Sequence, residues 1–177
     1  INMRFAVVTF PGSGGARDMS YGLGTVLGES VDYVMPDDAQ ELDCFDGIVI
    51  PNGFSYGNYL RAGAIAKLTP VMEQVEKAAR SGKLILGLGN GFQILLETGL
   101  LPGAMISNSN LRFHCGFVNI VVVNNRTVFT TEYAVDEILK LPIAHGDGNY
   151  YCDQQTLSDL KAHKQIVLDV LQQAFKR

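Results

Sequence analysis

The chain has 177 residues, of which 47% are hydrophobic and 18% are charged, and its formal net charge is −4 at pH 7. These values fit a soluble globular protein and predict one domain over residues 1–177 with a substantial core. A negative charge without a cluster of basic residues argues against nucleic acid or an anionic membrane as the partner. The longest uncharged apolar run, residues 84–96, is too short to span a bilayer.

The cysteines and histidines do not form a recognisable metal-binding or disulfide pattern. They are Cys44, Cys115, Cys152, His114, His145 and His163. An odd number of widely spaced cysteines predicts reduced thiols in a cytoplasmic protein. The histidines lack ligand spacing, so we do not expect a metal site. No cofactor is predicted either.

The first hundred residues alternate between buried-type strands and helices. Strands are predicted at residues 4–10, 31–35, 45–51 and in the apolar run that leads into Gly87. Helices are predicted at residues 19–27, 68–81 and 91–98. The first of these helices has Asp18 as its expected N-cap and ends before Gly28.

This alternation predicts an α/β fold with a parallel, doubly wound sheet. Ligands of such sheets bind at the carboxyl ends of the strands. Three loops should meet there: those that follow Phe10, Ile50 and Gly87.

The rest of the chain predicts further strands and helices. Strands are expected at residues 116–123 and 137–145, on either side of a turn at Asn124-Asn125 and a short strand near Val128. Helices are expected at residues 155–163 and 168–175.

Residues 83–101, KLILGLGNGFQILLETGLL, have the strand–turn–helix layout of a nucleophile elbow, G-x-(nucleophile)-x-G. A serine or cysteine is expected at the apex of such a turn, but this chain has Gly89. Glycine adopts strained backbone geometry at little cost, so a purely structural role for Gly89 is also open.

Four segments together resemble one family. They are FPGS, PNGFSYGNYLRAGAIA, LGLGNGFQILLETGLLPGAM and LPIAHGDGNYYCD. They are similar, in register from Arg4 to about Val167, to the glutaminase subunit of phosphoribosylformylglycinamidine synthase. That subunit is a class I, triad-type glutamine amidotransferase of purine biosynthesis. The resemblance implies a flavodoxin-like three-layer sandwich with a mostly parallel central sheet.

The resemblance also implies a reaction and partners. In the family, an elbow cysteine attacks the glutamine side-chain amide, and a histidine oriented by a glutamate transfers protons. Ammonia then passes to a large synthetase subunit, and a small accessory subunit completes the complex. By resemblance, Asn52, Gly53 and Asn90 lie at the oxyanion site, and Gln93 helps hold glutamine; a buried amide bonded to backbone is the alternative for Gln93.

The departures from the family concentrate on the catalytic residues. The family has G-x-C-N-G-F-Q where this chain has Gly89, and its M-P-H-P-E stretch, with the triad histidine and glutamate, does not occur in this sequence. The C-terminal part is therefore expected to be shortened. Other replacements lie at Gly14-Gly15-Ala16, Asn52, Asn58, Ala62 and Ser107.

These departures predict a catalytically inactive version of the glutaminase. A partner-docking pseudo-glutaminase and an engineered scaffold without a catalytic role are the alternatives. Cys115 and Cys152 are expected to be core or supporting residues rather than substitute nucleophiles, since a reactive thiol needs a lowered pKa and a nearby base.

Four residues are candidates for a partner interface, namely Tyr56, Tyr59, Arg61 and His145. Tyrosine and arginine are favoured interface anchors, although a self-packed loop explains the first three equally well. By resemblance, His145 belongs to a loop near the active site and the interface and is not the triad base.

Overall fold

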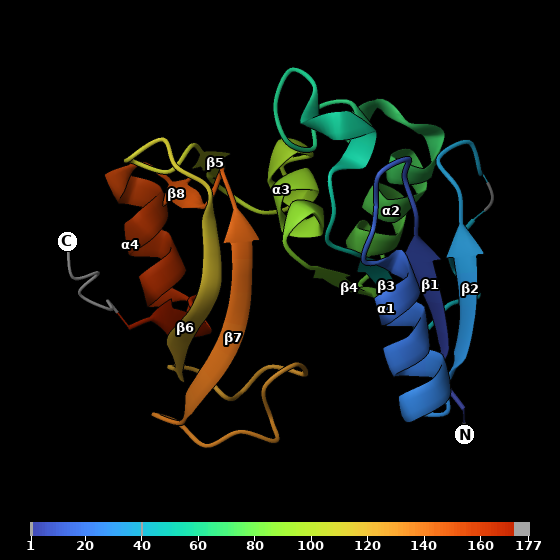
Figure 1. Ribbon diagram of the computed structural model, residues 1–177. Helices are drawn as coiled ribbons and strands as arrows, with labels where there is room; N and C mark the ends of the chain where they lie inside the picture. Colours follow the sequence, from blue (N-terminus) through green and yellow to red (C-terminus); the bar gives the residue numbers. More distant parts are fainter. Residues whose placement is uncertain (1, 40, 172–177) are drawn as a thin grey trace. The chain divides into compact units, whose positions relative to one another are not determined.

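The computed structural model describes residues 2–39 and 41–171. The chain divides into two compact units, Ile1–Ala104 and Met105–Arg177 (Figure 1). Whether these two units form one domain over residues 1–177 is not tested by this division, so the single domain remains a prediction. In the described part of the chain, no helix is long and apolar enough to cross a membrane.

The first unit is built on a four-stranded parallel sheet. Its strands are β1 (Arg4–Val8), β2 (Ser30–Val34), β3 (Gly47–Ile50) and β4 (Leu84–Gly87). They lie in the order β2-β1-β3-β4, and every neighbouring pair is parallel. The predicted parallel sheet of an α/β fold is therefore confirmed for this unit.

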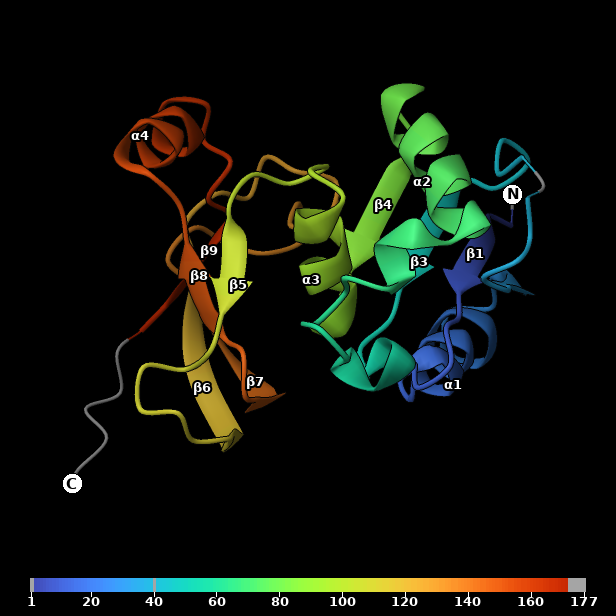
Figure 2. The ribbon, with the colours of Figure 1, turned by 90° about the horizontal axis from the view of Figure 1, so that it is seen from above.

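Helices cover both faces of this sheet, which gives three layers (Figure 2). Alternate residues of β1 and β3, such as Ala6 and Ile48, pack on one face with α2 (Pro70–Arg80) and α3 (Asn90–Glu97). Val7 and Val49 point to the other face and pack with residues of α1 (Ala16–Ser20) and of the helix that follows it. Two apolar cores thus fix the sheet between its helices.

The first helix begins earlier than predicted. α1 starts at Ala16 and continues directly into a π-helix, η1 (Tyr21–Val26). The N-cap is Gly15, so the prediction of Asp18 as the cap was wrong; Asp18 lies in the first turn. Tertiary contacts explain the shift, because the Gly15 N–H donates to Asn52 O and Ala16 is buried in the smaller core.

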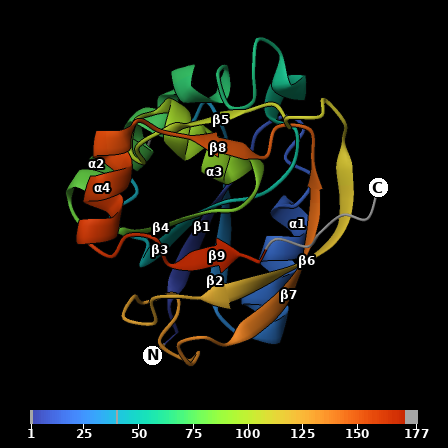
Figure 3. The same cartoon turned by 90° about the vertical axis from the view of Figure 1, so that its left-hand side faces the viewer.

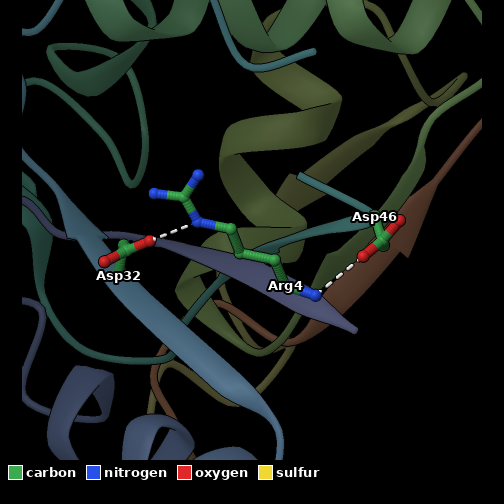
Figure 4. Close-up of polar contacts among 3 residues, drawn as sticks. All are labelled: Arg4, Asp32 and Asp46. Atoms are coloured by element: carbon green, nitrogen blue, oxygen red, sulfur yellow. Dashed lines mark hydrogen bonds and ion pairs between the residues drawn. The ribbon is translucent and has the colours of Figure 1, made fainter. Parts of the chain in front are cut away.

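Arg4 on β1 forms bonds to β2 and to the residue before β3 at one end of the sheet (Figure 4). Its Nε lies 2.7 Å from Asp32 Oδ2 on β2, and its backbone N–H donates to Asp46 just before β3. The bond to Asp32 and its negative charge raise the pKa of Arg4. Its guanidinium also lies 4.7 Å from the ring centre of Phe45.

The second unit contains antiparallel pairing. Its main sheet has the order β7-β6-β9, from β6 (His114–Val122), β7 (Ile138–His145) and β9 (Leu168–Val170) (Figure 3). β5 (Ala104–Ile106) and β8 (Asn149–Tyr151) form a two-stranded sheet. α4 (Gln154–Ala162) is capped by Asp153, whose pKa is lowered because it accepts the Thr156 N–H.

Two predictions for this unit were wrong. Residues 168–170 form β9 rather than a helix, because they pair with the free edge of β6, with Val170 opposite Ile120. Residues 172–175 of that predicted helix lie outside the described residues. Val128 lies in turns rather than in a strand, and the neighbouring Thr130 hydroxyl donates to Asn124 O.

Candidate active site

The elbow has the backbone geometry of a sharp strand-to-helix turn. β4 ends at Gly87, and Gly89, with φ 52° and ψ −108°, is the N-cap of α3. This combination of angles is costly for any residue with a side chain and inexpensive for glycine. The predicted strand–turn–helix layout, with Gly89 at its apex, is present.

Gly91 lets α3 approach the sheet closely. A Cβ at this position would overlap the carbonyl of Ile50 at the end of β3. The Leu88 N–H donates to that same carbonyl over 2.9 Å. The close approach holds the start of α3 beside the loop that follows β3.

The loops after β1, β3 and β4 meet at the carboxyl ends of the strands, as the sequence predicted. The loop after β3 is bonded to the loop after β1 by three backbone contacts. They run from Gly15 N to Asn52 O over 3.0 Å, from Phe54 N to Gly12 O over 2.8 Å, and from Tyr56 N to Pro11 O over 2.7 Å. Gly53, with φ +147°, has no room for a side chain against the backbone of this first loop.

The Asn52 side chain occupies the space between the elbow and the first loop. A Cβ at Gly89 would lie 3.1 Å from Asn52 Cβ, which is tighter than ordinary van der Waals contact. A Cβ at Gly15 would overlap the Asn52 carboxamide oxygen. Asn52 therefore lies next to Gly89 and next to Gly15, two other positions at which the chain departs from the family pattern.

Asn90 ties the elbow to the loop after β3. Its side chain is 4% exposed, and its Oδ1 accepts the Ser55 N–H over 2.9 Å. Its Nδ2 donates to Asn58 Oδ1 over 3.2 Å and to Gln93 Oε1 over 3.0 Å. The predicted site residues Asn90 and Gln93 thus form one amide network beside Gly89 with Asn58, a position at which the chain departs from the family pattern.

Ser55 was not singled out from the sequence. Its hydroxyl is buried and has no hydrogen-bond partner among the described residues. The pattern GFSYG gives no sign of this, because burial depends on the tertiary fold, in which the Ser55 N–H donates to Asn90 of α3. The hydroxyl is available to a small polar ligand or a water molecule beside Asn90.

The candidate interface residues of the first unit differ in exposure. Tyr56 packs on Phe10 with ring centres 6.1 Å apart, and burial, with a smaller effect of Asp37, raises its pKa. Tyr59 is 74% exposed. Arg61 forms a bidentate ion pair with Glu97 of α3, with N–O distances of 2.6 and 2.7 Å.

His145 lies in the second unit and is held by Asn108. Asn108 Nδ2 donates to Arg112 O and His145 O, so its Oδ1 faces the Gly148 N–H and His145 Nδ1. An oxygen only accepts, so Nδ1 carries the proton in the neutral ring. Burial lowers the pKa of His145, the nearby His114 lowers it further, and Asp147 raises it.

Asn108 itself was missed in the sequence, where it stands in an unremarkable polar stretch, SNSN.

Three other positions of interest also lie in the second unit. Cys115 is exposed, Cys152 is half-buried, and the Ser107 hydroxyl lies 2.7 Å from Asp147 Oδ1. Within the described ranges, no three His, Cys, Asp or Glu side chains are grouped to hold a metal ion.

Three solved structures are similar to the chain. A structure of PurLQS from Thermotoga maritima matches at 44% identity and a TM-score of 0.82, over 87% of this chain and 72% of that one. A glutamine amidotransferase from the same organism matches at 17% identity and a TM-score of 0.63, over 87% and 64%. The glutaminase domain of CTPS from Trypanosoma brucei matches at 15% identity and a TM-score of 0.55, over 91% and 72%.

The two matches below 25% identity support the fold alone, and they agree with the predicted flavodoxin-like amidotransferase architecture. The match at 44% identity supports the family resemblance that the sequence predicted. A family model for the CobB/CobQ-like glutamine amidotransferase domain matches residues 2–175. The chain belongs to the family of CobB/CobQ-like glutamine amidotransferase domains.

Proposed function

We propose that this chain is the glutaminase-type subunit of a phosphoribosylformylglycinamidine synthase and that, with Gly89 at its elbow, it does not hydrolyse glutamine. The assignment to this synthase is supported by the motifs GFSYGNYLRAGAIA and AHGDGNYYCD and by the 44% identity to PurLQS. The partners are then a large synthetase subunit and a small accessory subunit. The three free cysteines are consistent with a cytoplasmic location.

One observation carries the proposal of inactivity. The backbone at Gly89 keeps the angles of an elbow, but the residue has no side chain to form an acyl-enzyme. The Asn52 side chain fills the space beside it. A nucleophile is therefore lost in a scaffold whose turn geometry is intact.

Glutamine binding is a separate part of the proposal. Gln93 and Asn90 keep their amide groups beside the elbow. The nearby Ser55 hydroxyl has no hydrogen-bond partner among the described residues. The Ser55 hydroxyl can donate to or accept from a carboxamide, while the Asn90 amide holds Asn58 and Gln93 in place at the elbow. A chain that binds glutamine or its synthetase without turnover would be a docking pseudo-glutaminase.

The test is ammonia release from glutamine by the full chain, alone and with the synthetase subunit, its other substrates and the accessory subunit. We expect no release above background, together with co-elution of the chain and the synthetase in size-exclusion chromatography. Turnover by the chain would overturn the proposed inactivity. Failure to co-elute would overturn the docking role, and an engineered scaffold without a role would then be the better explanation.

Glutamine binding is measured on its own by calorimetry. Asn90→Asp is the variant expected to weaken it, since it removes the two amide donations that hold Asn58 and Gln93 beside the elbow. Lys67→Gln, at an exposed position of the short 3₁₀-helix Ala66–Leu68, is the matched control, and it should bind as the parent chain does. Equal binding by Asn90→Asp would exclude the amide network from glutamine recognition.

A further inference from the structure

The second unit contains a cavity of about 400 Å³ that the proposed function does not use. Its walls come from three segments: the turn after β6, the loop before β7, and the end of α4 with the residues that follow it. The lining residues are Val123, Asn124, Asn125, Arg126, Val135, Leu160, Lys161, Lys164 and Ile166. A volume of this size fits a small organic ligand.

The charge of the lining is one-sided. Arg126, Lys161 and Lys164 are exposed, and the lining contains no acidic residue, although the whole chain has a net charge of −4. Arg126 is far in the sequence from Lys161 and Lys164, and the fold brings it next to them. Such a grouping attracts an anion with several charges.

The nearest acids in the sequence are engaged elsewhere or do not line the cavity. Asp159 Oδ1 accepts from Gln155 Nε2 one turn away on α4. Glu137 Oε2 accepts the Ala134 N–H. Asp136 follows Val135 but is not part of the lining. The charges of the three cations are therefore not neutralised by carboxylates of the cavity wall.

Side-chain amides hold the walls in place. Asn124 Nδ2 donates to Lys164 O over 2.7 Å, and Asn124 Oδ1 accepts the Arg126 N–H over 2.9 Å. Asn125 Nδ2 donates to Tyr133 O over 3.0 Å. Hydrogen bonds from the two asparagine amides thus connect the walls of the cavity. The three cationic side chains form no hydrogen bond or ion pair among the described residues.

The remaining wall is apolar and consists of Val123, Val135, Leu160 and Ile166. We propose that this cavity binds a small organic molecule bearing two or more phosphate groups. Its phosphates contact Arg126, Lys161 and Lys164, and its non-polar part packs on the aliphatic wall. Arginine and lysine both bind phosphate well, arginine in bidentate geometry.

The experiment measures binding to the full chain by calorimetry, with ATP, tripolyphosphate, AMP and adenosine as probes. We expect ATP to bind most tightly, tripolyphosphate and AMP more weakly, and adenosine not at all. Increasing salt should weaken ATP binding, because the attraction is between charges.

Arg126→Gln, Lys161→Gln and Lys164→Gln should each weaken ATP binding by about tenfold. Lys140→Gln is the matched control, since it removes one positive charge from the same unit but does not line the cavity. Circular dichroism verifies that each variant is folded. Because all four substituted side chains are exposed, we expect the variants to remain folded.

Three outcomes would overturn the proposal. The first is no saturable binding at millimolar ATP. The second is equal weakening by Lys140→Gln, which would mean general charge attraction. The third is equal affinity for tripolyphosphate and ATP, which would remove the role of the apolar wall and leave a site for inorganic polyphosphate.

Discussion

Gly89 and Asn52 lie so close that a side chain at position 89 would meet the side chain of Asn52. A Cβ at Gly89 would be 3.1 Å from Asn52 Cβ, and the Asn52 carboxamide already covers Gly15. By resemblance, the family has cysteine at position 89 and glycine at position 52. The two changes are therefore next to each other in space: the asparagine side chain lies where a side chain at position 89 would meet it.

Gly89→Cys alone should lower the free energy of unfolding by about 1–3 kcal/mol, because a residue with a Cβ takes on the strained angles and the Asn52 contact. Adding Asn52→Gly should recover part of this loss. Urea unfolding of the parent, both single variants and the double variant gives the coupling, which we expect to exceed about 0.5 kcal/mol. Additive effects would show that the two side chains do not compete.

Gly91→Ala should be more damaging, with a loss of about 3 kcal/mol or more, because the new methyl group would overlap the Ile50 carbonyl and force α3 away from β3. Gly22→Ala is the matched control, since a Cβ there meets nothing within 4 Å and its φ is ordinary. That control should be neutral or stabilising by up to about 1 kcal/mol. Thermal unfolding of both variants is sufficient, and a mild effect at Gly91 would contradict the close approach.

The strands of the first unit could be predicted because each is a short apolar run that ends at glycine, proline or a polar residue. Their convergence at one edge follows from parallel pairing. The coupling of Asn52 to Gly89 and Gly15 could not be predicted, since these positions come from three separate loops and meet only in the folded chain. For the same reason, the sequence did not predict that Gly15 rather than Asp18 is the N-cap of α1.

The second unit was harder to predict. Leu168 and Leu171 have the spacing of a helix face, whereas Leu168 and Val170 alternate as on a strand, and only the pairing with the edge of β6 decides between them. Short apolar runs are ambiguous in this way. Likewise, the Asn108 contacts and the cluster of Arg126, Lys161 and Lys164 depend on segments that are tens of residues apart.

Asn90 should be necessary for the stability of the elbow. Asn90→Ala removes one acceptor and two donated bonds from a buried site, so a loss of about 2–3 kcal/mol is expected. Asn90→Asp keeps the shape and the bond from Ser55 but directs an oxygen toward Asn58 Oδ1 and Gln93 Oε1, so it should also destabilise. Urea unfolding measures both. A neutral Asn90→Asp would mean that the two donated bonds contribute nothing.

His145 should make stability depend on pH. Burial lowers its folded pKa below the ordinary value of 6.5, with His114 adding to the effect and Asp147 opposing it. The unfolded chain therefore binds the proton more readily, so the contribution of His145 to the unfolding free energy is fully present above pH 6.5 and is lost as the pH falls through the folded pKa.

The check compares the parent chain with His145→Gln, which lacks this proton. The difference in unfolding free energy between them should shrink on going from about pH 8 to about pH 5, since only the parent loses the contribution of the neutral ring. NMR of the ring nitrogens gives the second readout. It should report a pKa below 6.5 and a proton on Nδ1, the nitrogen that faces Asn108 Oδ1 over 3.0 Å. A pKa at or above 6.5 would show that burial does not control this histidine.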